Sequence, residues 1–159
     1  MQRRLLALAA CVASLAAAGC AARQIDVAKS VNLIQKAVEE QVGADVRAIK
    51  CPDTVAVKAK ATFTCAVTGR DGTTGTATVT QTDGKGTITV AAPFLEAEQS
   101  IQTDLRTRSP RATVVCPDII VVKKGGKFVC RANLGEINAT VTATQTNATG
   151  SFTYNVQSR

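Results

Sequence analysis

The chain has 159 residues, a net charge of +7, no histidine or tryptophan, one tyrosine and four phenylalanines. Nucleic-acid binding usually combines cations with aromatic rings that stack on bases, so we expect no nucleic-acid partner. The lack of histidine also excludes a histidine general base and imidazole ligands for a metal, and we expect no cofactor.

Residues 1–19 have the organisation of an export signal. Arg3 and Arg4 precede an uncharged run, Leu5 to Ala18, which suits a signal-peptide core but is shorter than the roughly 20 residues that span a bilayer. The run ends Ala-Ala-Gly-Cys20, and a lipoprotein signal peptidase accepts small residues before a cysteine. We therefore expect residues 1–19 to be removed, Cys20 to carry diacylglycerol, and residues 20–26 to be a tether at the outer face of the cytoplasmic membrane.

An ordinary secretory signal is the alternative. Cleavage near Ala18, Gly19 or Ala22 would leave Cys20 as a spare thiol on a secreted protein. By either route the mature chain keeps 17 basic and 12 acidic residues, a net charge of +5, because residues 1–19 contain two arginines and no acid. On an exported protein this charge favours anionic lipid headgroups or wall polymers as partners.

The four cysteines that follow Cys20 have a repeated spacing. Cys51-Pro-Asp and Cys116-Pro-Asp lie 65 residues apart, and 13 residues separate each of them from a second cysteine, Cys65 or Cys130. An even set of cysteines in small exported units predicts disulfides. Because each unit can close its own loop, we expect the pairs Cys51–Cys65 and Cys116–Cys130.

The repeat extends on both sides of the cysteines and predicts two α+β domains, residues 27–90 and 91–159. Each begins with an apolar stripe at helical spacing: Val31, Ile34, Val38 and Val42, then, at an offset of 63, Phe94, Ala97, Ile101 and Leu105. Asp26 and Ser30 are candidate N-caps of the first helix, and Pro93 suits the first turn of the second, expected at 93–106. Strand-like segments follow in the first copy at 46–50, 55–58, 62–67, 76–81 and 87–90. Each unit is therefore expected to pack one helix on a roughly four-stranded antiparallel sheet.

The pattern Val/Ile-x-Cys-Pro-Asp, then Val-Lys and Phe-x-Cys, resembles the actinobacterial family catalogued as domain of unknown function 4333. The resemblance covers residues 27–90 and 93–156 and implies a lipoprotein or membrane-anchored protein with a small α+β fold. It supplies no catalytic residues. A glycine that is common between the Lys and the Phe is present as Gly125 and Gly126, whereas Ala59 and Lys60 stand there in the first copy, so one turn is expected to differ.

The repeated polar residues do not form an obvious catalytic set. Asp53 and Asp118 follow a proline and suit turns in which the carboxylate accepts nearby backbone N–H bonds. Lys58 and Lys123 suit the solvent face of a strand. The second copy adds a basic concentration that is a candidate patch for an anionic partner: Lys123, Lys124, Lys127 and Arg131.

These features favour a non-catalytic envelope lipoprotein that binds an envelope protein or an anionic wall or lipid component. A secreted inhibitor of an extracellular enzyme is one alternative. A glycan enzyme that uses carboxylates alone is another, and it needs two acids that converge in a cleft.

Overall fold

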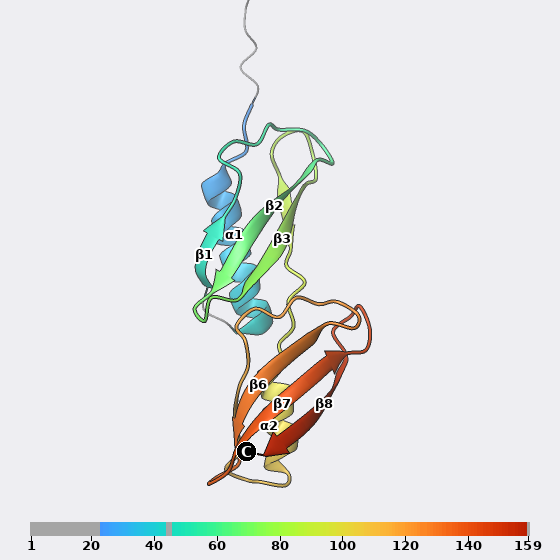
Figure 1. The fold of residues 1–159 in the computed structure, drawn as a ribbon. Helices are drawn as coiled ribbons and strands as arrows, with labels where there is room; N and C mark the ends of the chain where they lie inside the picture. The colour runs from blue at the N-terminus through green and yellow to red at the C-terminus, as the bar shows by residue number, and fades with distance from the viewer. Residues whose placement is uncertain (1–22, 44–45, 159) are drawn as a thin grey trace, which may run out of the picture.

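The computed structural model describes residues 23–43 and 46–158, so Cys20 and the expected signal segment lie outside the described residues. The first unit contains α1 (Val27–Val42), β1 (Val46–Lys50), β2 (Thr62–Gly69), β3 (Thr74–Gln81) and β4 (Ile88–Ala91). The second contains α2 (Glu98–Arg106), β5 (Thr113–Val115), β6 (Lys127–Asn133), β7 (Asn138–Gln145) and β8 (Phe152–Ser158). Each unit has a four-stranded antiparallel sheet in sequential strand order, with its helix on one face (Figure 1). The predicted α+β fold of two repeats is confirmed.

The first helix has the ends that its sequence predicts. The Asp26 carboxylate accepts a bond from Lys29 N at 3.1 Å, which satisfies one of the unpaired N–H groups of the first turn. Gly43 closes the helix at φ 62°, and its N–H donates to Glu39 O at 3.0 Å. Ser30, the other candidate cap, lies inside the helix and is buried.

The second helix begins later than predicted. It starts at Glu98, and Phe94 lies in an extended segment that bridges Val121. Leu95 N donates to Ile120 O and Val122 N to Pro93 O, so these pairings hold the segment outside the helix. Burial matches Ile34 and Val38 with Ile101 and Leu105, an offset of 67 instead of 63.

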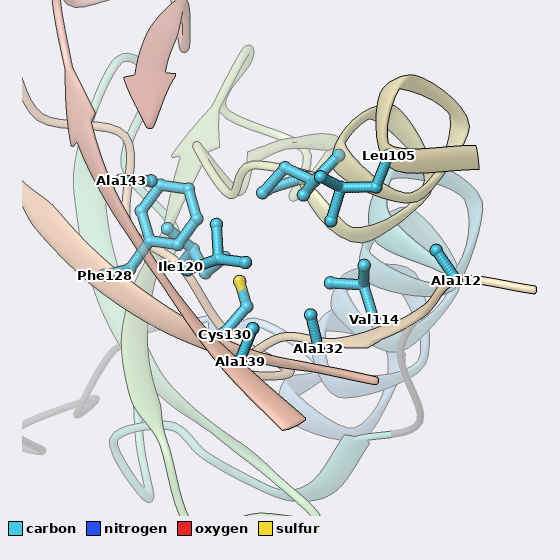
Figure 2. Close-up of a cluster of buried hydrophobic side chains, with 12 residues drawn as sticks. Leu105, Ala112, Val114, Ile120, Phe128, Cys130, Ala132, Ala139 and Ala143 are labelled. Carbon is cyan, nitrogen blue, oxygen red and sulfur yellow. The ribbon is translucent and has the colours of Figure 1, made fainter. Parts of the chain in front are cut away.

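The cores follow from the alternation of each strand. In β6, Phe128, Cys130 and Ala132 point inward and are buried, while the residues between them are exposed. They pack beneath α2 with Leu105 and Val114, and the rings of Phe128 and Phe152 meet edge to face with centroids 5.5 Å apart (Figure 2). In the first unit, the predicted inward face of β2 is confirmed, with Cys65 and Val67 fully buried.

The predicted strand at 55–58 is not a strand, because a buried glutamine side chain takes the place of a strand partner. Gln81 Nε2 donates to Ala56 O at 3.0 Å, and Lys58 N donates to Gln81 Oε1 at 2.7 Å. Gln145 makes the same two bonds in the second unit, with Val121 O and Lys123 N. Each unit therefore holds the segment before its second cysteine with an amide.

The expected tether is also shorter than predicted. Ile25 N donates to Val55 O at 2.8 Å, and Val57 N donates to Arg23 O at 2.7 Å. Ile25 is buried, at 7% exposure. Arg23 to Ile25 therefore belong to the folded unit, as Pro93 to Leu95 do in the second.

Candidate functional site

The two disulfides link neighbouring strands within each unit. Cys51, directly after β1, is bonded to Cys65 in β2, and Cys116, directly after β5, is bonded to Cys130 in β6. The Cα atoms are 4.3 Å and 4.2 Å apart. The pairs are those that the spacing predicts, and they fix the start of each Cys-Pro-Asp segment against the sheet.

The second Cys-Pro-Asp segment touches the first unit. Asp71 N donates to Asp118 Oδ2 at 2.9 Å, and Asp118 N donates to Asp71 Oδ2 at 3.1 Å. Ile119 N also donates to the hydroxyl of Thr73 at 3.0 Å. Asp118 thus bonds across the junction between the units instead of within its own turn.

Two glycines in the β2–β3 hairpin make this approach possible. A Cβ atom on Gly69 would lie 2.5 Å from the Asp118 Cβ, and one on Gly75 would lie 2.4 Å from the Phe94 ring. Both distances are far below van der Waals contact, so only glycine fits at either position. Phe94 and Ile119 consequently complete the hydrophobic core of the first unit.

An open cleft of about 650 Å³ lies beside this junction. Its lining combines the second Cys-Pro-Asp segment with charged and amide side chains of both signs, among them Arg70, Glu96, Glu98, Gln102 and Arg106. Several of these groups already serve the fold. Glu98 accepts from Cys116 N at 3.0 Å, Gln102 accepts from Val114 N at 3.1 Å, and Arg106 Nε donates to Ala112 O at 3.0 Å.

The candidate basic patch lies on the uncovered face of the second sheet. Lys127 and Arg131 are exposed in β6 and point away from α2, with exposed Val129 between them. The register places hydroxyl and amide side chains beside them, in rows that run across β6, β7 and β8: Lys127, Thr144 and Thr153; Val129, Thr142 and Asn155; Arg131, Thr140 and Gln157. These nine residues, which we term the basic sheet face, include no acid.

Lys123 and Lys124 extend the basic sheet face at the end where β6 begins. They lie in the turn before β6, which closes by a bond from Gly126 N to Lys123 O at 2.8 Å. Both side chains are exposed. Among the described residues, none of these two lysines, Lys127 and Arg131 forms a salt bridge.

The same positions in the first unit carry no charge. With the offset of 65, Thr62, Thr64 and Ala66 of β2 correspond to Lys127, Val129 and Arg131. Thr62 pairs with Thr80 and Thr64 with Thr78, so this face is built mainly of threonine. The two sheets therefore have one architecture and two different surface chemistries.

Hydrogen bonds shape the ionisation of three groups. Burial opposes ionisation of Asp71, but bonds from Thr73 and Asp118 outweigh it and hold the pKa of its carboxyl below the ordinary value. Bonds from Thr87 and Lys85 lower the pKa of Asp83 in the same way. Burial, with the neighbouring Asp104 carboxylate, raises the pKa of Tyr154 to about 12.

Sequence reasoning identified the basic residues but not the junction. Asp71 was expected only as part of a turn, and Thr73 and Phe94 were given no role at the junction. One signal was available: Gly69 and Gly75 stand where the second copy has Leu134 and Ala139. No cluster of three or more His, Cys, Asp or Glu residues suited to a metal occurs in the described ranges, nor does a helix there have the length and apolarity to cross a membrane.

Comparison with known proteins identifies the family. The family model named domain of unknown function (DUF4333) matches residues 6–86, which is just over half of the chain. No curated protein and no solved structure shows significant similarity. The match spans the first Cys-Pro-Asp unit, whose pattern the second unit repeats, and the chain belongs to the DUF4333 family.

Proposed function

We propose that this protein is an exported, lipid-anchored, non-catalytic binding protein of the cell envelope, and that its basic sheet face binds an anionic glycan. The observation that carries the partner is the chemistry of that face. Two cations are set among threonine hydroxyls, an asparagine and a glutamine, with no carboxylate on the grid. Cations pair with phosphate or carboxylate groups, while hydroxyls and amides hydrogen-bond to sugar hydroxyls.

The dimensions of the face suit a polymer. Lys127 and Arg131 are four residues apart in one strand, which corresponds to about 13 Å along the chain. Lys123 and Lys124 continue the basic surface beyond Lys127. Repeated charges along a flat strand match repeated charges along an extended polymer better than a single small molecule, which usually needs a concave apolar pocket.

Export and anchoring are supported by two features. The N-terminal segment has the pattern of a lipoprotein signal that ends at Cys20. The four cysteines of the folded units form disulfides, and such bonds persist in oxidising compartments outside the cytosol.

The acid pair at the junction does not favour a glycosidase. Asp71 and Asp118 converge, but each carboxylate accepts a backbone N–H bond from the other residue. The lowered pKa of Asp71 keeps its carboxyl ionised, whereas a glycosidase needs a carboxylic acid that retains its proton. The pair holds the two units together, and no second function is proposed on it.

Two measurements test the proposal. Mass spectrometry of the native protein is expected to find diacylglycerol on Cys20 as the first residue, and an unmodified N-terminus at Ala21 or later would contradict the anchor. Binding to a purified phosphate- or uronate-bearing wall glycan is expected to weaken with salt and after Lys123, Lys124 and Lys127 are changed to Glu. Equal binding to a neutral glycan would contradict the proposed partner.

A further inference from the structure

Four exposed cations gather at the end of the first unit where the described chain begins. Arg23 lies beside Val57 through the bond from Val57 N, which brings Lys58 to the same place. Lys60 lies in the next turn, tied by its N–H to Gln81 O at 2.8 Å. Lys85 belongs to the β3–β4 turn, in which a Cβ on Gly86 would lie 3.5 Å from Ile25 and 3.8 Å from Val57. We term Arg23, Lys58, Lys60 and Lys85 the N-terminal basic cluster.

This cluster lies at the opposite end of the molecule from the second unit. Both turns that carry its lysines converge at the top of the first unit in Figure 1, where the chain enters, and the second unit lies below. Only two residues separate Cys20 from Arg23, so three peptide links of at most about 11 Å join the anchoring residue to a residue held in the fold. A lipid on Cys20 would bring the cluster to the headgroup layer.

Lys60 provides an independent observation. It is the one described residue other than glycine with a positive φ, at 63°. Gly125 occupies the corresponding position in the second unit with φ 75°, where no side-chain strain arises. The first unit thus places a lysine where the backbone favours glycine, and this substitution adds a cation at the end nearest Cys20.

The acids of this end leave a positive balance. Asp26 caps α1, Asp83 accepts the bonds of its own turn, and Asp53 lies in the connection that follows Cys51. Lys29 in the first turn of α1 adds a further cation to the four of the cluster. The five cations exceed these three acids by two charges.

From these observations we infer that the N-terminal basic cluster is a membrane-docking surface that contacts anionic phospholipid headgroups. The inference rests on the proposed anchoring at Cys20. A lipid chain and a basic patch act together, because each adds binding free energy that the other does not supply. Docking would hold the first unit on the bilayer and project the basic sheet face of the second unit away from it.

Lysine footprinting tests this surface. Residues 20–159 contain the whole described fold, and the Cys20 thiol can be coupled to a maleimide lipid in vesicles, so the test does not depend on lipidation in the cell. Amine acetylation is then followed by mass spectrometry on phosphatidylcholine vesicles with and without phosphatidylglycerol. Lys58, Lys60 and Lys85 are expected to react about fivefold more slowly on the anionic vesicles, the equivalent of about 1 kcal/mol per cation. Lys123, Lys124 and Lys127 are expected to react equally on both.

A variant separates docking from stability. Lys60→Gly is expected to raise the melting temperature and yet weaken the protection of Lys58 and Lys85, whereas Lys36→Gln on α1 should leave that protection unchanged. Equal acetylation on both vesicles, or protection that falls on Lys123 to Lys127 instead, would overturn the inference. Protection by inorganic phosphate without vesicles would also overturn it, because the surface would then be a site for free phosphate. Each of these results is independent of whether native Cys20 carries lipid.

Discussion

Asp71 and Asp118 each accept a hydrogen bond from the backbone N–H of the other, at 2.9 Å and 3.1 Å, although they belong to different units. Asp71 also accepts from Thr73 N and from its hydroxyl, so one carboxylate orders a turn and joins a partner. With Phe94 and Ile119 in the core of the first unit, this reciprocal pair makes the junction specific. The orientation of the basic sheet face relative to the first unit depends on it.

Removal of the Asp118 carboxylate is expected to destabilise the protein. Asp118→Ala leaves Asp71 N without its acceptor, and we expect a loss of about 1 kcal/mol in the free energy of unfolding. Asp53 is the corresponding residue of the first unit and makes no hydrogen bond through its side chain among the described residues. Denaturant unfolding of Asp118→Ala and Asp53→Ala compares them, and equal losses would show that the junction bonds contribute nothing.

Acid is expected to weaken the protein through Asp71. Because the folded pKa of this carboxyl lies below its ordinary value of 3.8, its contribution to stability is present above that value. The contribution is lost as the pH falls through the lower, folded pKa. Melting temperatures measured from pH 6 downward are expected to drop less steeply in Asp71→Asn than in the parent protein, and parallel curves would contradict this role.

Gly75→Ala is expected to disturb the junction. The added methyl group would lie 2.4 Å from the Phe94 ring and 2.8 Å from Ile119 Cγ2, so Phe94 or the strand must move. Overpacking of this kind costs about 1–3 kcal/mol. Ala139→Gly at the matched position of the second unit creates no clash and serves as the control. Retention of full stability by Gly75→Ala would show that the two units are less closely packed than the structure indicates.

Lys60→Gly is expected to stabilise the fold by about 1 kcal/mol, because glycine adopts φ 63° without the clash of a Cβ atom. Gly125→Ala at the matched turn is expected to destabilise by a similar amount for the same reason. Thermal unfolding of both variants measures the effect. Loss of stability in Lys60→Gly would mean that the lysine side chain makes a favourable contact.

Local patterns in the sequence predicted the fold well. The spacing of the cysteines predicted both disulfides, and the alternation of Phe63, Cys65 and Val67 predicted the inward face of β2. The helix register was wrong because a shift of four residues turns a helix by only about 40°, so the same apolar stripe fits both alignments. Burial, which decides between them, is a property of the packed structure.

Long-range relationships were harder to predict. The strand expected at 55–58 failed because Gln81, distant in the sequence, supplies its hydrogen bonds. The turn expected to differ at Lys60 instead keeps the left-handed backbone of Gly125, since the Gln81 carbonyl holds its N–H. The junction depends on atoms 47 residues apart, and no local pattern places Asp118 against Asp71.

A matched pair of double variants tests the central claim most directly. Lys127→Glu/Arg131→Glu reverses both charges of the basic sheet face, and Thr62→Glu/Ala66→Glu adds the same two acids at the corresponding positions of the first unit. We predict that the first pair weakens binding to a purified anionic wall glycan at least about tenfold, equivalent to about 1.4 kcal/mol, while the second changes it less than about twofold. Equal losses in the two variants, or no loss in Lys127→Glu/Arg131→Glu with the fold intact, would contradict the proposal that this face binds the partner.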